Sequence, residues 1–148
     1  MITAENQILD ISEIESLTLK LCNNIKVGDV LMLKGELGAG KTTFSRFIIN
    51  NLYKKENLTK PNIINSPTYP ILLTYKIGLF EIYHYDLYRI KNIRELEELD
   101  FFENLKNSIT LIEWPELLIE IPFIHKYYLI NLNIHSETKR NINIEYFK

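Results

Sequence analysis

A glycine-rich segment that ends in lysine and threonine lies near residue 40. Its residues, Gly35-Glu36-Leu37-Gly38-Ala39-Gly40-Lys41-Thr42, match the pattern G-x-x-x-x-G-K-[ST]. The glycines let the backbone turn so that successive N–H groups face the oxygens of a phosphate chain. Lys41 adds a positive charge for the outer phosphates, and we expect that charge to be exposed. The hydroxyl of Thr42 suits Mg²⁺, which takes few protein ligands. The segment predicts binding of a nucleoside triphosphate, ATP, together with Mg²⁺.

The sequence on either side has the pattern that this motif requires. Residues 30–33 are a short apolar run, typical of a buried strand. In residues 42–53 the large apolar side chains follow helical spacing. A helix that begins directly after the glycines adds the positive end of its dipole to the phosphate site.

Two acidic residues are candidates for the chemistry. Glu113 is the last residue of a predicted strand, 108–113, and the carboxyl ends of strands form the ligand crevice in open α/β sheets. Asp86 shares a strand face with His84, because residues two apart point to the same side. Either acid could hold Mg²⁺ or orient an attacking water, so Lys41, Asp86 and Glu113 are the candidate catalytic residues. Glu113 could also be an ordinary acid at a strand end, and His84 a structural histidine.

A loop with two hydroxyl groups, Ser66-Pro67-Thr68, follows the predicted helix 42–53. Thr68 could reach the γ-phosphate and act as a switch, or its hydroxyl could close a local turn. We expect this loop to be free to move until a partner packs on it. Arg89, predicted to face away from Asp86, is expected to be a salt-bridge partner.

The remaining elements follow from apolar periodicity and turn residues. We expect a helix over residues 12–24, capped at Ser12, and a helix over 93–105 with a break near Asp100. Further strands are expected over residues 71–75, 80–88, 127–134 and 141–147. This order predicts an α/β fold, a P-loop NTPase-like sandwich whose mixed sheet has a parallel core and antiparallel additions. We expect a single domain over residues 1–148.

Composition excludes several classes of site. A net charge of −2 gives no general attraction to nucleic acid or to an anionic membrane, so RNA would be met through a partner. Cys22 is the only cysteine, which excludes an intramolecular disulfide and a cysteine-cluster metal site. The first ten residues lack the features of a signal peptide, and no uncharged apolar run reaches membrane-spanning length. We therefore expect a cytoplasmic protein without a membrane contact.

Four motifs together resemble one family closely. They are Gly35 to Thr43, Ser66-Pro67-Thr68-Tyr69, His84-Tyr85-Asp86-Leu87-Tyr88-Arg89 and Ile112-Glu113-Trp114-Pro115-Glu116. In this order, over roughly residues 28–118, they are similar to the TsaE family, also called YjeE.

The resemblance implies a small bacterial ATPase required for threonylcarbamoyladenosine (t6A), the modified base beside the anticodon of tRNAs that read ANN codons. Its implied protein partners are TsaD, which transfers the threonylcarbamoyl group, and TsaB. Lys41 and the loop backbone would hold phosphates, with Thr43 at a further functional position. Thr42 and Glu113 would hold Mg²⁺, and Asp86 would assist at the γ-phosphate. Ser12 and the pair Lys139-Arg140 are the candidates for contacts to the nucleotide base.

Two other functions fit a glycine loop of this type. A small-molecule kinase would usually need a lid with arginines at the transferred phosphate, whereas this chain has only Arg46, Arg89, Arg94 and Arg140. Arg46 lies in the helix after the glycines and Arg140 on a distant turn. A GTP-dependent switch would usually carry an Asn-Lys-x-Asp stretch, which does not occur here. Measuring phosphate release with and without candidate acceptors distinguishes an ATPase from a kinase. Comparing the binding of ATP with that of GTP distinguishes an ATPase from a GTP-dependent switch.

Overall fold

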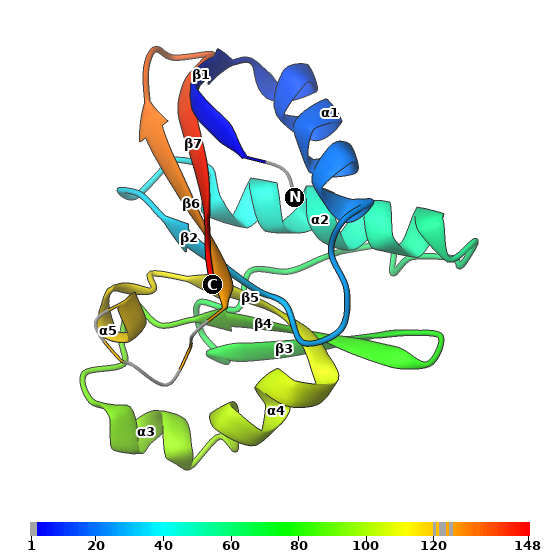
Figure 1. Ribbon diagram of the computed structural model, residues 1–148, viewed down its shortest axis with the longest axis vertical. Helices are drawn as coiled ribbons and strands as arrows, with labels where there is room; N and C mark the ends of the chain where they lie inside the picture. Colours follow the sequence, from blue (N-terminus) through cyan, green and yellow to red (C-terminus); the bar gives the residue numbers. More distant parts are fainter. Residues whose placement is uncertain (1–2, 120, 122–123, 125) are drawn as a thin grey trace.

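A twisted sheet runs through the middle of the molecule, with helices on both faces (Figure 1). The computed structural model describes residues 3–119, 121, 124 and 126–148. The elements of these residues, in chain order, are β1 Ala4–Leu9, α1 Ile11–Cys22, β2 Val30–Lys34, α2 Lys41–Lys55, β3 Leu72–Ile77, β4 Phe80–Asp86, α3 Ile93–Glu97, α4 Phe101–Asn107, β5 Ser108–Glu113, α5 Glu116–Ile119, β6 Tyr127–Ile134 and β7 Arg140–Phe147.

The strand order is β1-β7-β6-β2-β5-β4-β3. The four central strands are parallel, because β2 pairs in parallel with both β5 and β6, and β5 pairs in parallel with β4. Antiparallel pairs extend the sheet at both edges, β3 against β4 on one side and β7 between β6 and β1 on the other. The predicted α/β class, with a parallel core and antiparallel additions, is confirmed.

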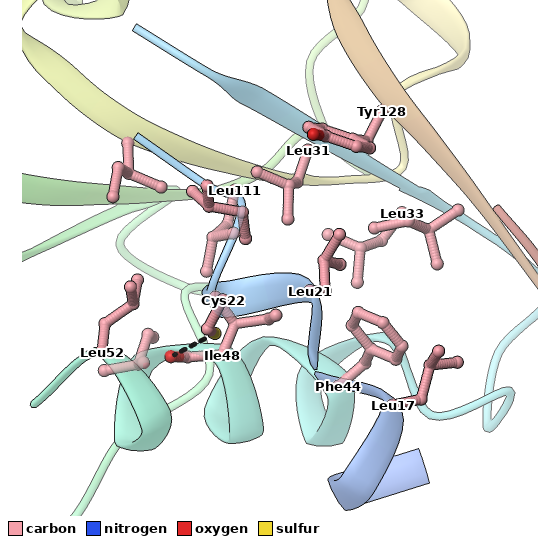
Figure 2. Packing of buried hydrophobic residues seen from close by; sticks show 14 of the residues in the cluster. Leu17, Leu21, Cys22, Leu31, Leu33, Phe44, Ile48, Leu52, Leu111 and Tyr128 are labelled. Carbon is pink, nitrogen blue, oxygen red and sulfur yellow. Dashed lines mark hydrogen bonds between the residues drawn. The ribbon is translucent and has the colours of Figure 1, made fainter. Parts of the chain in front are cut away.

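Two apolar clusters separate the layers. Along β2, Leu31 and Leu33 face the helices α1 and α2, whereas Val30 and Met32 face α3, α4 and α5. Figure 2 shows the first cluster, in which side chains of α1 and α2 pack together against the sheet. The continuous apolar run of β2 thus reflects burial on both faces, as expected for a central parallel strand.

The N-terminal segment differs from the sequence-based expectation. Residues 4–9 form β1, an edge strand that pairs with β7 through its backbone, although only Ala4 is buried. The cap of α1 is Asp10 and not Ser12: the Asp10 side chain accepts from the Glu13 N–H, and the Glu13 side chain accepts from the Asp10 N–H. This reciprocal pair leaves Ser12 inside the first turn, so the predicted cap was two residues late.

The other boundaries agree more closely. The predicted break near Asp100 is confirmed, because Asp100 takes a left-handed conformation between α3 and α4. The strand predicted over residues 80–88 ends earlier, at Asp86, and Tyr88 and Arg89 lie in the turn that follows.

Candidate nucleotide-binding site

The carboxyl ends of three parallel strands meet at one edge of the sheet. The register pairs Glu113 of β5 with Leu33 of β2 on one side and with Asp86 of β4 on the other. The glycine loop leaves β2 one residue after Lys34 and leads into α2. Both predicted acids and the loop therefore share one crevice, as is usual for ligand sites in this class of fold.

Glycines allow the close turn of this loop. Gly38 and Gly40 have positive φ angles of 79° and 102°, which favour glycine. A Cβ atom on Gly35 would lie 2.3 Å from the carbonyl oxygen of Leu132 in β6, so only glycine fits there. The loop is thus packed from behind by β6, with its helix N-terminus at Lys41.

Lys41 is buried, so the expectation of an exposed charge is wrong. The residue is 5% exposed, and its Nζ donates to the carbonyl oxygens of Gly35 (2.7 Å) and Glu36 (2.9 Å). The same atom lies 3.8 Å from the centre of the Trp114 ring, within cation–π range. Burial lowers the pKa of Lys41, against the opposing effect of carboxylates such as Glu113. The cation is held by groups that a phosphate chain could replace.

Glu113 joins the loop to the neighbouring strand. Its Oε2 accepts a hydrogen bond from the Thr42 hydroxyl (2.8 Å), and its Oε1 lies 2.7 Å from Nε2 of His84. Because a carboxylate only accepts hydrogen bonds, both partners donate. Glu113 is 2% exposed and His84 is fully buried. His84 therefore fixes the orientation of the acid, which agrees with the structural interpretation of this histidine.

Asp86 organises the hydroxyl-bearing loop. Its Oδ2 accepts from the Thr68 hydroxyl (2.9 Å), and its Oδ1 accepts from the N–H of Tyr88 (3.0 Å). Arg89 donates to the carbonyl oxygens of Thr68 and Tyr69. Arg89 was expected in a salt bridge; in the part of the chain that the structure describes it bonds to backbone carbonyls instead. The loop was also expected to be free, but these bonds tie it to the end of β4.

Most of the predicted site residues line one cavity of about 260 Å³. Its lining consists of Leu37, Gly38, Gly40, Lys41, Thr42, Thr43, Thr68, Asp86, Glu113 and Trp114. Gly35 and Glu36 contribute through the carbonyl groups that hold Lys41. Ala39 is buried behind the loop. The cavity has the polar lining that suits a phosphate chain.

A second, more apolar cavity of about 330 Å³ lies on the other side of the loop. Ile11 and Ile14 of α1, Thr43 and Phe44 of α2, and Arg140 are among its lining residues. Arg140 is far from the loop in sequence but lies against it in space, so the description of its turn as distant is wrong. Ser12 does not line this cavity: its hydroxyl donates to Asp10 Oδ1 (2.8 Å).

Comparison with known proteins gives the family. The family model for threonylcarbamoyl adenosine biosynthesis protein TsaE matches residues 8–142. The chain is 44% identical over 135 residues to the tRNA threonylcarbamoyladenosine biosynthesis protein TsaE of Rickettsia felis, covering 89% of this chain and 74% of that protein. The protein of the same name from Rickettsia typhi is 44% identical over 125 residues, covering 82% and 81%. The chain belongs to the TsaE family.

A solved structure supports the fold of this TsaE-family chain. The crystal structure of Bacillus subtilis YdiB superposes with a TM-score of 0.68, covering 99% of this chain and 88% of that one at 24% identity. No helix in the described residues is long and apolar enough to cross a membrane.

Two contacts of the TsaE-family site were not predicted. Trp114, named above only as part of a family motif, lies against Lys41 and contacts Tyr88, with the ring centres of Trp114 and Tyr88 4.8 Å apart. The pairing of His84 with Glu113 also escaped sequence reasoning. Each lies near the carboxyl end of a predicted strand, but only the pairing of β4 with β5 brings the two side chains together.

Proposed function

We propose that this chain hydrolyses ATP in support of t6A modification of tRNA. The curated TsaE relatives carry threonylcarbamoyladenosine biosynthesis in their names. The contact that carries the ATPase proposal is the 2.8 Å hydrogen bond from Thr42 to Glu113. It brings the last residue of the glycine motif onto the strand-end acid, as a P-loop ATPase requires.

The residues fit Mg²⁺. The Thr42 hydroxyl donates its hydrogen to Glu113, which leaves oxygen lone pairs for a cation. Hydroxyl and carboxylate oxygens are the hard ligands that Mg²⁺ prefers, and it keeps several waters besides. In the described residues no group of three or more His, Cys, Asp or Glu could hold a metal ion. When bound, Mg²⁺ supplies positive charge at the phosphate oxygens.

The loop and its lysine bind and orient the triphosphate. Backbone N–H groups at the start of α2 would bind the phosphates, because the helix dipole favours negative charge there. Lys41 leaves the carbonyl groups of Gly35 and Glu36 and donates to phosphate oxygens instead. In hydrolysis, a water oxygen attacks the γ-phosphorus and the bond from that phosphorus to the β–γ bridging oxygen breaks. The electron pair of the broken bond stays on ADP, and the attacking water gives up a proton to solvent as it becomes part of the released phosphate.

Asp86 and Glu113 line the same cavity as Lys41 and Thr42. Thr68 and the Tyr88 N–H orient Asp86, and His84 and Thr42 orient Glu113. Each acid is therefore held in one position before the reaction, which lowers the cost of reorganisation. Either acid can accept a hydrogen bond from the attacking water.

The chain alone is expected to be a slow ATPase. A supplied arginine is worth roughly 10³–10⁵ in rate. Arg46 donates to the Ile64 carbonyl, Arg89 to the carbonyls of Thr68 and Tyr69, and Arg140 to those of Gly38 and Ala39. Arg94 is exposed on α3. A partner that adds positive charge at the γ-phosphate would complete the site, and we propose the TsaB–TsaD complex in this role.

The test is steady-state phosphate release by the purified chain while the TsaB–TsaD complex is titrated in. We expect slow release alone and a rise that saturates with partner concentration. Parallel reactions with GTP and with candidate phosphoryl acceptors separate hydrolysis from a GTP switch and from a kinase. Turnover of tens per second without partner, unchanged by its addition, would contradict the proposal.

A further inference from the structure

Arg140 lies at the start of β7, where the register pairs it with Leu9 of β1 and Ile134 of β6. From there its side chain reaches the glycine loop. Nε donates to the Ala39 carbonyl (3.1 Å) and Nη2 to the Gly38 carbonyl (3.3 Å). The third nitrogen, Nη1, donates to carbonyl groups of its own turn, Ser136 and Lys139, both at 3.1 Å. All three guanidinium nitrogens thus bond to backbone carbonyls.

The contacts of Arg140 also determine where the neighbouring backbone N–H groups point. In a trans peptide the carbonyl and the N–H point in opposite directions. The Gly38 carbonyl faces Arg140, so the N–H of Ala39 faces away and donates across the loop to Glu36 (3.1 Å). The Ala39 carbonyl also faces Arg140, so the N–H of Gly40 faces away. Arg140 contacts the outer side of the loop, and the amides turn to the inner side.

We propose that Arg140 is a positioning residue for phosphate binding. It fixes the two peptide planes between Gly38 and Gly40, so that their carbonyl oxygens stay turned away from the phosphate-binding side of the loop. This inference rests on the proposed function, because it assigns a role within the same site. It differs from a contact between Arg140 and the nucleotide base.

The loop needs such a clamp because of its glycines. A glycine beside a peptide plane allows that plane to flip with little steric penalty. A flipped plane would present a carbonyl oxygen to the phosphates, which repels them. Gly38 and Gly40 flank both planes and have left-handed φ angles. A guanidinium bonded to both carbonyls makes either flip costly, since charge-assisted hydrogen bonds must break.

The test compares Arg140→Met with Arg94→Met, which removes the same residue type from an exposed position on α3. Calorimetry measures the affinity for ADP and for inorganic tripolyphosphate, which has no base. We expect Arg140→Met to weaken both about ten-fold, the equivalent of about 1.4 kcal/mol. Arg94→Met should change neither. Arg140→Lys keeps the charge and can reach one carbonyl, so its affinities for both ligands should lie between those of wild type and Arg140→Met. If Arg140→Met does not fold, Arg140→Lys is compared with wild type instead.

Each alternative gives a different result. Weaker binding of ADP with unchanged binding of tripolyphosphate would show a base contact and overturn the inference. Unchanged binding of both ligands by Arg140→Met would also overturn it. Failure of the wild-type chain to bind either ligand would contradict the proposed function itself.

Hydrogen exchange provides a second measurement. The amides of residues 38–42 should exchange faster in Arg140→Met, while the amides of β2 and β5 keep their wild-type rates. Faster exchange across the whole sheet would indicate a general structural role and contradict a local clamp.

Discussion

Two regions of the molecule are equally buried but are built differently. In the cluster between α1, α2 and the sheet, Leu21, Leu31 and Phe44 are fully buried among apolar side chains (Figure 2). At the carboxyl ends of the parallel strands, Lys41 and Glu113 are 5% and 2% exposed. In the first region, apolar side chains are shielded from water. In the second region, charged groups are shielded from water.

The difference lies in what each buried group requires. Apolar contacts are non-directional, so a core residue needs only neighbours of suitable volume. A buried charge needs specific partners, since an unpaired one costs several kcal/mol. At the site these partners are backbone carbonyls, a hydroxyl and an imidazole, and they hold Lys41 and Glu113 in place. The site is thus ordered before a nucleotide binds, and the hydrogen bonds that hold Lys41 can be exchanged for bonds to phosphate oxygens.

The largest effect is expected from Leu21→Ala in the apolar cluster. It should lower the free energy of unfolding by about 2–5 kcal/mol, because a cavity remains after the side chain is removed. Denaturant unfolding measures this. The matched control is Leu19→Ala on the same helix, where the residue is 50% exposed and the loss should be about 0.5 kcal/mol or less. Equal losses would refute the assignment of Leu21 to the core.

Lys41→Ala should lower activity much more than stability, the opposite of Leu21→Ala. Hydrolysis is expected to fall roughly 10²–10³-fold, as for the loss of one preorganised donor, while the melting temperature stays within a few degrees. Removing the side chain also removes the buried charge, so no unpaired ion is left in the folded chain. Lys54→Ala, an exposed lysine of α2, is the control and should keep its activity. Normal ATP hydrolysis by Lys41→Ala would exclude this loop as the phosphate site.

Glu113→Ala separates binding of the metal ion from binding of the phosphates within the site. Affinity for ADP with Mg²⁺ should fall roughly ten-fold or more, because the carboxylate that would hold the cation is removed. Affinity without Mg²⁺ should change less, since the loop amides hold the phosphates directly. The exposed Glu103 provides the control, Glu103→Ala. Equal losses with and without Mg²⁺ would make Glu113 a structural residue only.

The last prediction concerns Cys22, whose thiol lies 3.6 Å from the Ile48 carbonyl (Figure 2). Burial raises the pKa of Cys22 to about 12. At pH 8 the thiolate fraction in the folded chain is then about 10⁻⁴, against roughly a quarter when unfolded. The thiol's contribution to stability is complete below about pH 8.5 and is lost as the pH rises toward 12. Thiol labelling at pH 8 should be slow when folded and fast in denaturant; rapid labelling of the folded chain would contradict its burial.

Local pattern determined much of this protein. The apolar run of β2, the glycine motif and the helical spacing after it depend on residues close in sequence, and all three elements lie where they were predicted. The parallel core followed from the order of elements, because strands joined through helices pair in parallel. The edge strand β1 was missed because its side chains are mostly exposed and carry no alternating pattern.

Tertiary structure alone decided the partners of the site residues. Sequence predicted that Glu113 ends a strand, but only the pairing of β5 with β4 places it against His84. Sequence assigned Lys41 a free charge, and only the fold placed it under Trp114. Arg140 lies a hundred residues from the loop that it contacts. Contacts at such separation depend on how strands pair, and a hydrogen bond of 3 Å leaves no trace in the local pattern of either partner.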